Sequence, residues 1–501
     1  MSRRVKVELN RVEGDLEIEL SIDDGVVTDA WCIGTQYRGF EQIMIGREPM
    51  DALAITPRIC GICSTAHLFA SAKALEDLAG VTPPANAIRI RNICLLVEEI
   101  QSDCRQTFLM FTPDLCHSKY QDHPQQSAIS TLFSDMSGTI YRDAVINSRK
   151  LVEIVAIFGG QWPHSSYMVP GGVTSLPDRS KVLSSLAICN NYTRWFEESV
   201  IGCQLDEWLD IQNTDQLQSY LNKSDAAVSQ LYRFCSDIGL NEVGMGSGLL
   251  ISYGSLVDPE NPEQQIRSSG LYNCSDNSFT SLDQGLISED VSHSWFHDDS
   301  QQPRHPLKGI TQPKYDPDNG RYSWAKAPRY NGRVAQTGPL AQLVVDKDPL
   351  TLDLIQKNGA NSLVRQFIRI HRQALSLRLL KQQLTELLEK INEPSFTHCA
   401  LPETGQGIGM LEAARGSLGH WIDVKNGKID RYQIVTPTAW NASPRDHQGN
   451  RGHIESSLLG LTVSDLSDPV EIGHVVRSHD PCLVCTVHVL GGRKHRYGVV
   501  R

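Results

Sequence analysis

The sequence lacks long apolar runs and clusters of basic residues. No run among its 501 residues approaches the ~20 apolar residues that a membrane-spanning helix needs, so no membrane span is predicted. The 47 Lys and Arg residues are outnumbered by 58 Asp and Glu, for a net charge of -11. Nucleic acids and anionic membranes bind clustered basic side chains, so neither is expected as the main partner. The hydrophobic share of 40% excludes disorder for the bulk of the chain.

An apolar signal segment is also missing. Met1 to Lys6 passes directly into an alternating strand pattern, which predicts no signal peptide. The cysteine count of 13 is odd, so these cysteines cannot all pair, and a chain of this length does not need disulfides. A reducing compartment is therefore expected, where closely spaced cysteines usually bind metal or do redox chemistry.

The periodicity of apolar residues predicts a mainly α (α+β) fold. Alternation at period two indicates a β-hairpin or small sheet over about the first 35 residues. The strongest helical pattern runs from Ser362 to Ile391 without Pro or Gly and suits the centre of a helical bundle. Other helices are expected over 88–111, 126–158, 178–210 and 216–237, loops with short strands over 254–335, a helix beginning near Leu411, and strands over 421–435. We expect one large body rather than the three domains that ~150 residues per domain would give.

Two short segments carry closely spaced cysteines. Cys60 and Cys63 flank Gly61-Ile62, and Cys482 and Cys485 follow Asp480-Pro481. Two thiols three positions apart can point into one coordination sphere. The pairs lie 482 − 60 = 422 residues apart, so a shared site requires the fold to bring the two ends of the chain together.

Several kinds of site use such cysteines. A structural four-cysteine zinc site has the right number of ligands but normally takes its pairs from within ~15–20 residues. Redox dithiols of the thioredoxin type open a βαβ unit, which neither segment does. Four thiolates around a soft, redox-active transition metal are the third alternative. The remaining cysteines are expected to be buried and inert: Cys32, Cys94, Cys104, Cys116, Cys189, Cys203, Cys235, Cys274 and Cys399.

The two cysteine segments, each followed by a histidine, resemble the N- and C-terminal signature motifs of the large subunit of nickel–iron (NiFe) hydrogenases. Other segments resemble further motifs of that family in the same order: Arg11–Gly14, Arg38–Glu41, Phe158–Gly172, Ser323–Leu340, Glu412–Trp421 and Tyr432–Asn441. The resemblance implies a NiFe-hydrogenase large-subunit-like fold, with a central bundle of long helices, a small N-terminal β layer and a mixed C-terminal segment.

The resemblance also implies the roles of the cysteines. Cys60 and Cys482 would be terminal thiolates on nickel, and Cys63 and Cys485 would bridge nickel and iron, with carbon monoxide and cyanide on the iron. Hydrogen would be split heterolytically, which needs a base for the proton. The first candidate is the thiolate of Cys482, which would hand its proton to Glu13.

Arg415 is the second candidate base, because it resembles the family arginine that lies above the metals. A free guanidinium is essentially always protonated. Arg415 would therefore need pairing with Asp103 and Asp480 to act as more than an electrostatic anchor.

Two features near the C-terminus also rest on the resemblance. Glu41, His488 and the backbone carbonyl of Ile434 are implied as a Mg²⁺ site, for which oxygen ligands are suitable. Family members are cut after the position of His488 once nickel is inserted. We therefore expect residues 1–488 to be the single mature domain and 489–501 to be a maturation peptide.

The expected function is reversible oxidation of H2 by the catalytic large subunit of an uptake hydrogenase, with an H2-sensing regulatory subunit as the alternative. The cysteines outside the two motifs form no iron–sulfur ligand array, so electrons are expected to pass to an iron–sulfur small subunit. A maturation protease and nickel-insertion factors are expected as further partners. The expected location is the cytoplasm; membrane association through partners, or export with the small subunit, is the alternative.

Overall fold

The computed structural model describes residues 3–297 and 302–486, with Cys485 and Thr486 described by their backbone alone. The α-helices in these ranges are α1 (Phe40–Met44), α2 (Asp51–Ile55), α3 (Ser64–Ala79), α4 (Ala85–Arg105), α5 (Gln126–Phe133), α6 (Thr139–Leu151), α7 (Glu153–Gly159), α8 (Arg179–Trp195), α9 (Leu205–Leu209), α10 (Thr214–Lys223), α11 (Ala227–Asp237), α12 (Pro339–Val345), α13 (Pro349–Asn358), α14 (Ser362–Glu389), α15 (Pro437–Asn441), α16 (His453–Ser457), α17 (Val470–Ser478) and α18 (Leu483–Thr486).

The strands are short except in the N-terminal sheet, formed by β1, β2 and β3, and the C-terminal sheet, formed by β13, β14 and β15. They are β1 (Arg3–Leu9), β2 (Leu16–Asp23), β3 (Val26–Gly34), β4 (Met168–Val169), β5 (Gly172–Val173), β6 (Leu249–Ser252), β7 (Ser255–Val257), β8 (Gln265–Arg267), β9 (Gly270–Asn273), β10 (Ser278–Thr280), β11 (Ile287–Asp290), β12 (Ala327–Tyr330), β13 (Gly405–Ala413), β14 (Gly416–Lys425) and β15 (Lys428–Val435). The loops and short strands expected over 254–335 are confirmed.

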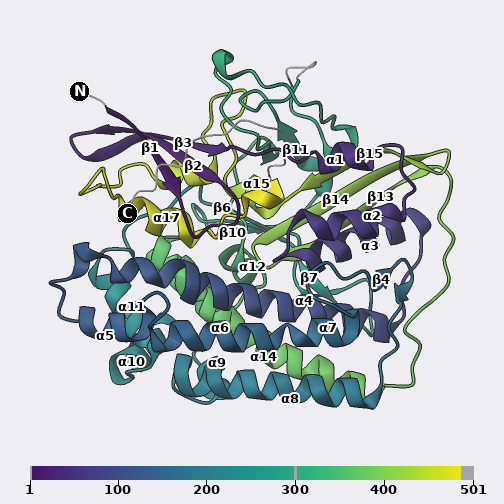
Figure 1. Cartoon of the computed structure of the whole chain (residues 1–501), viewed down its shortest axis with the longest axis horizontal. Helices are drawn as coiled ribbons and strands as arrows, with labels where there is room; N and C mark the ends of the chain where they lie inside the picture. The colour runs from purple at the N-terminus through teal and green to yellow at the C-terminus, as the bar shows by residue number, and fades with distance from the viewer. Residues whose placement is uncertain (1–2, 298–301, 487–501) are drawn as a thin grey trace.

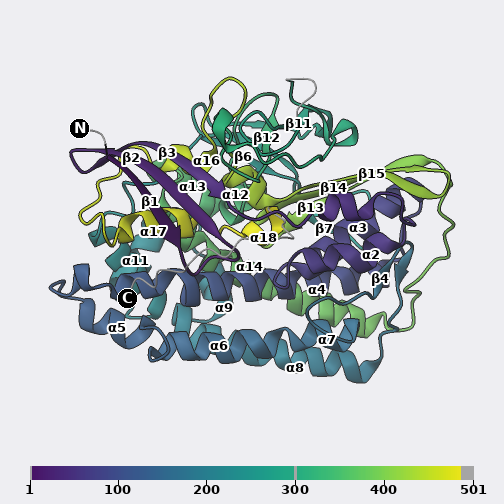
Figure 2. The ribbon, with the colours of Figure 1, turned by 45° about the horizontal axis from the view of Figure 1, so that its top comes forward.

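Helix α14 is the centre of a layer of long helices. It packs against α4, α8, α11 and α12. The long helices α4, α8 and α14 lie in the lower half of Figures 1 and 2. Asn361 begins the helix by accepting a hydrogen bond from the backbone N–H of Val364 at 2.8 Å. The predicted central helix is therefore confirmed. The other expected helical stretches also form helices, but three of them are divided. The stretch 126–158 contains α5, α6 and α7, 178–210 contains α8 and α9, and 216–237 contains α11 and most of α10.

The N-terminal sheet is antiparallel in the order β1-β2-β3, as the alternation predicted. Leu16, Ile18, Leu20 and Ile22 are buried, whereas the residues between them are partly exposed. The buried side chains pack against apolar residues of α16 and α17. The turn between β1 and β2, over residues 10–15, consequently lies near the second cysteine segment, which follows α17.

The C-terminal sheet, in the order β13-β14-β15, corrects one prediction. Leu411 lies in β13 and pairs with Leu418 of β14, so the expected helix start near Leu411 is wrong. Glycines at alternate positions of β13 face α3 so closely that a Cβ atom on Gly409 would lie 1.9 Å from the carbonyl oxygen of Ala70. The Leu-Glu-Ala-Ala sequence has good helix propensity, but this backbone-to-backbone packing overrides it.

The contact predicts a loss of stability when Gly409 gains a side chain. Gly409→Ala is expected to lower the free energy of unfolding by about 1–3 kcal/mol, because the added methyl must displace the backbone of α3. Chemical denaturation followed by circular dichroism measures the change. Gly405→Ala is the control, since a Cβ there meets side-chain atoms rather than backbone: the end of Leu78 at 2.9 Å and Pro402 at 3.9 Å. Equal stability of the two variants would contradict the packing argument.

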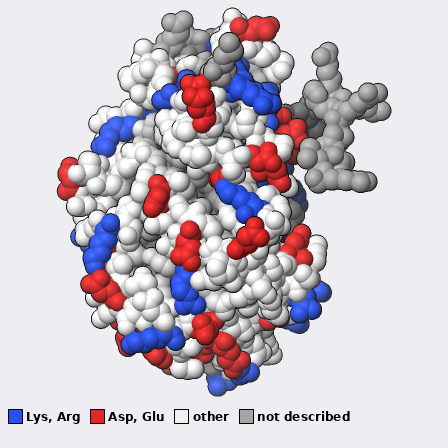
Figure 3. All heavy atoms as spheres, turned by 90° about the vertical axis from the view of Figure 1, so that its left-hand side faces the viewer, with Lys and Arg blue, Asp and Glu red and all other residues white. Residues whose placement is uncertain are grey.

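The N-terminal sheet packs with α16 and α17 in a cluster of its own. A larger cluster of buried apolar side chains contains Cys60, Cys63 and Cys482. It includes residues of α3, α4, α14 and the C-terminal sheet, and it extends from Met44 to Cys482. None of the helices in the described ranges combines the length and apolar composition needed to cross a bilayer. Lys and Arg are interspersed with Asp and Glu on the face in Figure 3, so no broad basic surface lies there.

Candidate metal centre

Three buried thiols from opposite ends of the chain lie together. The Sγ atoms of Cys60, Cys63 and Cys482 are all within 4.8 Å of one another, and those of Cys60 and Cys482 are 3.6 Å apart. The backbone of Cys485 lies in α18, one turn beyond Cys482, and its side chain is outside the described atoms. His488 and the 489–501 segment also lie outside the described residues.

The first cysteine segment is held at the start of α3. Cys60 follows the short 3-10 turn Thr56–Ile59, and Cys63 is the N-cap residue of α3. The carboxylate of Glu98, from α4, accepts hydrogen bonds from the backbone N–H groups of Thr65 at 2.7 Å and Ala66 at 3.0 Å. A buried carboxyl group, whose pKa burial raises to about 8, thus satisfies two of the open N–H groups of the helix that carries Cys63.

The second segment is held by the turn between β1 and β2. The backbone N–H of Cys482 donates to Thr438 Oγ1 at 2.9 Å, and that of Leu483 donates to the carbonyl oxygen of Glu13 at 2.6 Å. Gly14 has a φ of +84°, and a Cβ there would lie 2.9 Å from the Val484 nitrogen. Only glycine permits so close an approach in that conformation. Glu13 is therefore placed beside Cys482.

The surroundings of Glu13 favour its protonated form. Burial raises the pKa of its carboxyl group, and the charge of Cys60 raises it further, while Arg415 and Arg105 act in the opposite direction. A carboxyl group with a raised pKa is better matched to exchange of protons near neutral pH.

Arg415 is a buried cation beside the thiols. Its Nε lies 3.1 Å from Asp480 Oδ1. Burial opposes the charge, but Asp480 and the thiolates of Cys482 and Cys60 together raise the pKa of Arg415 well above its ordinary value. Arg415 therefore stays protonated, and its charge can stabilise nearby thiolates.

Asp103 is fully buried, and its ion pairs differ from the expected arrangement. Arg372 Nε lies 2.7 Å from Asp103 Oδ2, and Arg369 Nη1 lies 3.3 Å from Asp103 Oδ1. Arg369 in turn lies 3.6 Å from Asp480. Asp103 thus connects to the Arg415–Asp480 pair through Arg369 of α14. Neither arginine was predicted as a site residue from the sequence, although both lie among the apolar positions of the central helix, where a charged side chain needs a buried partner.

The residues expected to bind Mg²⁺ lie in a second polar cluster. Glu41 is buried, accepts the backbone N–H of Ile434 at 2.9 Å and lies 3.0 Å from Lys326 Nζ. Lys326 also lies 3.3 Å from Glu289 and donates to Gln433 Oε1 at 2.7 Å. Lys326, Glu289 and Gln433 were not predicted as individual site residues from the sequence.

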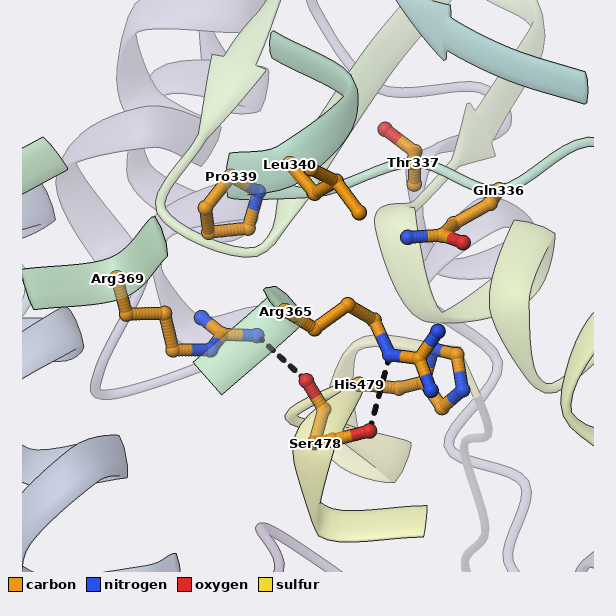
Figure 4. Close-up of a pocket in the computed structure, with 9 residues that line it drawn as sticks. Gln336, Thr337, Pro339, Leu340, Arg365, Arg369, Ser478 and His479 are labelled. Carbon is orange, nitrogen blue, oxygen red and sulfur yellow. Dashed lines mark hydrogen bonds between the residues drawn. The ribbon is translucent and has the colours of Figure 1, made fainter. Parts of the chain in front are cut away.

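A small cavity adjoins the ion pairs of Asp103, Arg369, Asp480 and Arg415 on the side of α14 (Figure 4). Arg365 and Arg369 line it, with Ser478, His479 and the 336–340 segment. Its volume is about 10 Å³, room for about one water molecule. Arg365 Nε donates to Ser478 Oγ at 2.9 Å, and Arg369 Nη2 donates to the Ser478 carbonyl oxygen at 3.3 Å. The cavity admits only the smallest molecules.

The cysteines outside the two motifs are separate from the thiol cluster. Cys32, Cys94, Cys104, Cys189 and Cys235 are buried, as expected. The expected burial is wrong for four others, which are only partly buried because they lie in loops or at the ends of elements: Cys116, Cys203, Cys274 and Cys399.

Three buried thiols, with the fourth cysteine of the motif one turn away, fit a soft transition metal better than a hard cation. The charge of Arg415 also favours an anionic thiolate centre at this position. The residues present are therefore suitable ligands for a NiFe centre.

Comparisons with known proteins find similarity to hydrogenase large subunits over nearly the whole chain. The family model described as nickel-dependent hydrogenase matches residues 38–109 and 110–488. The periplasmic [NiFeSe] hydrogenase large subunit of Desulfomicrobium baculatum is 32% identical, over 96% of this chain and 94% of its own. The hydrogenase-2 large chain of Escherichia coli (strain K12) is 29% identical over 98% of each chain. The solved structure of H2-activated [NiFeSe]-hydrogenase from Dm. baculatum matches with a TM-score of 0.85 and 30% identity, covering 97% of this chain and 100% of that one.

Proposed function

Because the chain belongs to the nickel-dependent hydrogenase family as a large subunit, we propose that it is the catalytic subunit of a NiFe uptake hydrogenase that oxidises H2 reversibly to protons and electrons. The observation that carries the proposal is the meeting of Cys60, Cys63 and Cys482 in one buried cluster. Cys485 completes the ligand set in this proposal.

The protein's own part in the reaction is to hold the centre and to move the proton. When bound, the NiFe centre supplies the Lewis acidity that polarises the H–H bond and takes up the electron pair. The thiolate of Cys482 accepts the proton, and Glu13 carries it away. The backbone hydrogen bond from Leu483 to Glu13, next to Cys482, and the raised pKa of the Glu13 carboxyl group support this route. The raised pKa of Arg415 favours an anchoring role over that of a base.

Asp480 and Asp103 hold the positively charged arginines in place in this proposal. Asp480 pairs directly with Arg415, the arginine whose charge acts on the thiols. Asp103 pairs with Arg369 and Arg372, and Arg369 also lies 3.6 Å from Asp480, so Asp480 is held between two arginines. Fixed charges around a reacting centre need no reorganisation during the reaction, which is the main advantage of such a site.

Mg²⁺ binding by Glu41, His488 and the Ile434 carbonyl remains part of the proposal. The buried position of Glu41 supports a structural cation there, with Gln433 and Glu289 as nearby oxygen groups. Lys326 already supplies one positive charge to Glu41. The proposed metal would therefore share the Glu41 carboxylate with this ammonium group.

Electrons would leave through an iron–sulfur small subunit, and removal of 489–501 by a maturation protease would follow nickel insertion. The cytoplasmic location stays a prediction, since one relative is named a periplasmic hydrogenase.

Turnover of the assembled complex tests the proposed function. The chain is produced with its small subunit and maturation factors, purified without oxygen, and supplied with H2 and a viologen dye as electron acceptor. An uptake hydrogenase is expected to turn over at about 1–10³ s⁻¹. Slow turnover in a complex with full nickel would favour the sensing alternative, and no turnover with no nickel would overturn the proposal.

A further inference from the structure

Arg38 contacts both cysteine segments. Its Nη2 donates to the carbonyl oxygen of Ile59 and to that of Val484, the latter at 3.0 Å. Ile59 directly precedes Cys60, and Val484 directly precedes Cys485. One guanidinium therefore joins backbone groups that are 484 − 59 = 425 positions apart in the chain.

The residues around Arg38 hold its side chain in place. The guanidinium lies over the ring of Phe40, with 4.8 Å from Cζ to the ring centroid. Gly39 has a φ of +68°, a left-handed conformation that favours glycine. This turn leads the chain into α1, where Glu41 is fixed by Ile434 of β15 and by Lys326. The backbone that follows Arg38 is thus held to the C-terminal sheet through Glu41.

The two cysteine segments also make backbone contacts with different parts of the molecule. Glu98 of α4 holds the segment with Cys63, whereas Thr438 and Glu13 hold the segment with Cys482. Motion of the Ile59 or Val484 carbonyl would move the thiol that follows it. A planar guanidinium with donors in fixed directions restricts both carbonyls at once.

We propose that Arg38 is a positioning residue that sets the placement of Cys60 and Cys63 relative to Cys482 and Cys485. The inference rests on the proposed function, because the placement matters for a centre shared by all four thiols. Lysine keeps the positive charge but lacks the planar donor group, so Arg38→Lys tests the donor geometry at constant charge. Arg38→Met removes both the charge and the donor group.

The test uses the complex with its small subunit, purified without oxygen. Nickel per chain and the infrared stretching bands of the metal-bound carbonyl and cyanide are measured for wild type, Arg38→Met and Arg38→Lys. Arg38→Met is expected to contain less nickel, to show shifted or broadened bands and to lose about 10- to 100-fold in H2 oxidation. Arg38→Lys is expected to regain nickel while its bands stay shifted.

Arg47→Met is the matched control, because Arg47 is exposed and its Nε donates to the nearby Ile43 carbonyl at 2.8 Å. Its nickel content and bands are expected to equal those of wild type. Wild-type nickel and unshifted bands in Arg38→Met would overturn the inference. If Arg38→Met does not assemble, unshifted bands in Arg38→Lys would overturn it, and shifted bands would support it. A wild-type complex without these bands would instead overturn the proposed function.

Discussion

Replacement of Cys482 by serine is expected to abolish H2 oxidation, with a loss larger than roughly 10³-fold. Loss of a positioned base alone costs about 10²–10⁴-fold. Cys482 is also a proposed ligand, so its removal affects the binding of nickel as well, because a hydroxyl group is a much poorer ligand for a soft metal.

Dye-linked H2 oxidation and nickel per chain measure the effect in the purified complex. Cys235→Ser is the control, since Cys235 is a fully buried thiol of α11 outside the thiol cluster. It is expected to retain nickel and activity. A Cys482→Ser complex with wild-type turnover would rule out Cys482 as ligand and proton acceptor.

Replacement of Glu13 by glutamine is expected to slow H2 oxidation by about 10²-fold, the lower range for loss of a positioned proton-transfer group. Glutamine has nearly the same shape but cannot carry the proton. Nickel per chain and the infrared bands are expected to remain those of wild type, because Glu13 is not a proposed ligand. This combination separates proton transfer from assembly of the centre.

The matched control is Glu17→Gln. Glu17 is a carboxylate of β2, close in sequence to Glu13, that lies 3.6 Å from Lys6 of β1 in the N-terminal sheet. It should turn over at the wild-type rate. Turnover of Glu13→Gln within twofold of wild type would show that the proton leaves by another route, whereas lost nickel would show that Glu13 supports the centre itself.

The sequence predicted features that depend on local periodicity and on motif spacing. The central helix α14 and the N-terminal sheet follow from apolar patterns that each element carries itself. The meeting of Cys60 and Cys482 could be expected because one shared site explains both motifs.

The features that were missed depend on partners distant in the sequence. The helix predicted at Leu411 fails because the close packing of Gly409 on α3 is not visible in the local sequence. Asp103 was assigned to Arg415, since neither Arg369 nor Arg372 could be placed opposite it without the packing of α4 on α14.

The infrared spectrum of the complex, purified without oxygen, reveals whether the four cysteines hold a NiFe centre. If Cys60, Cys63, Cys482 and Cys485 hold a NiFe centre, the spectrum shows stretching bands of metal-bound carbon monoxide and cyanide. Their absence from a folded complex whose thiols hold zinc would contradict the account.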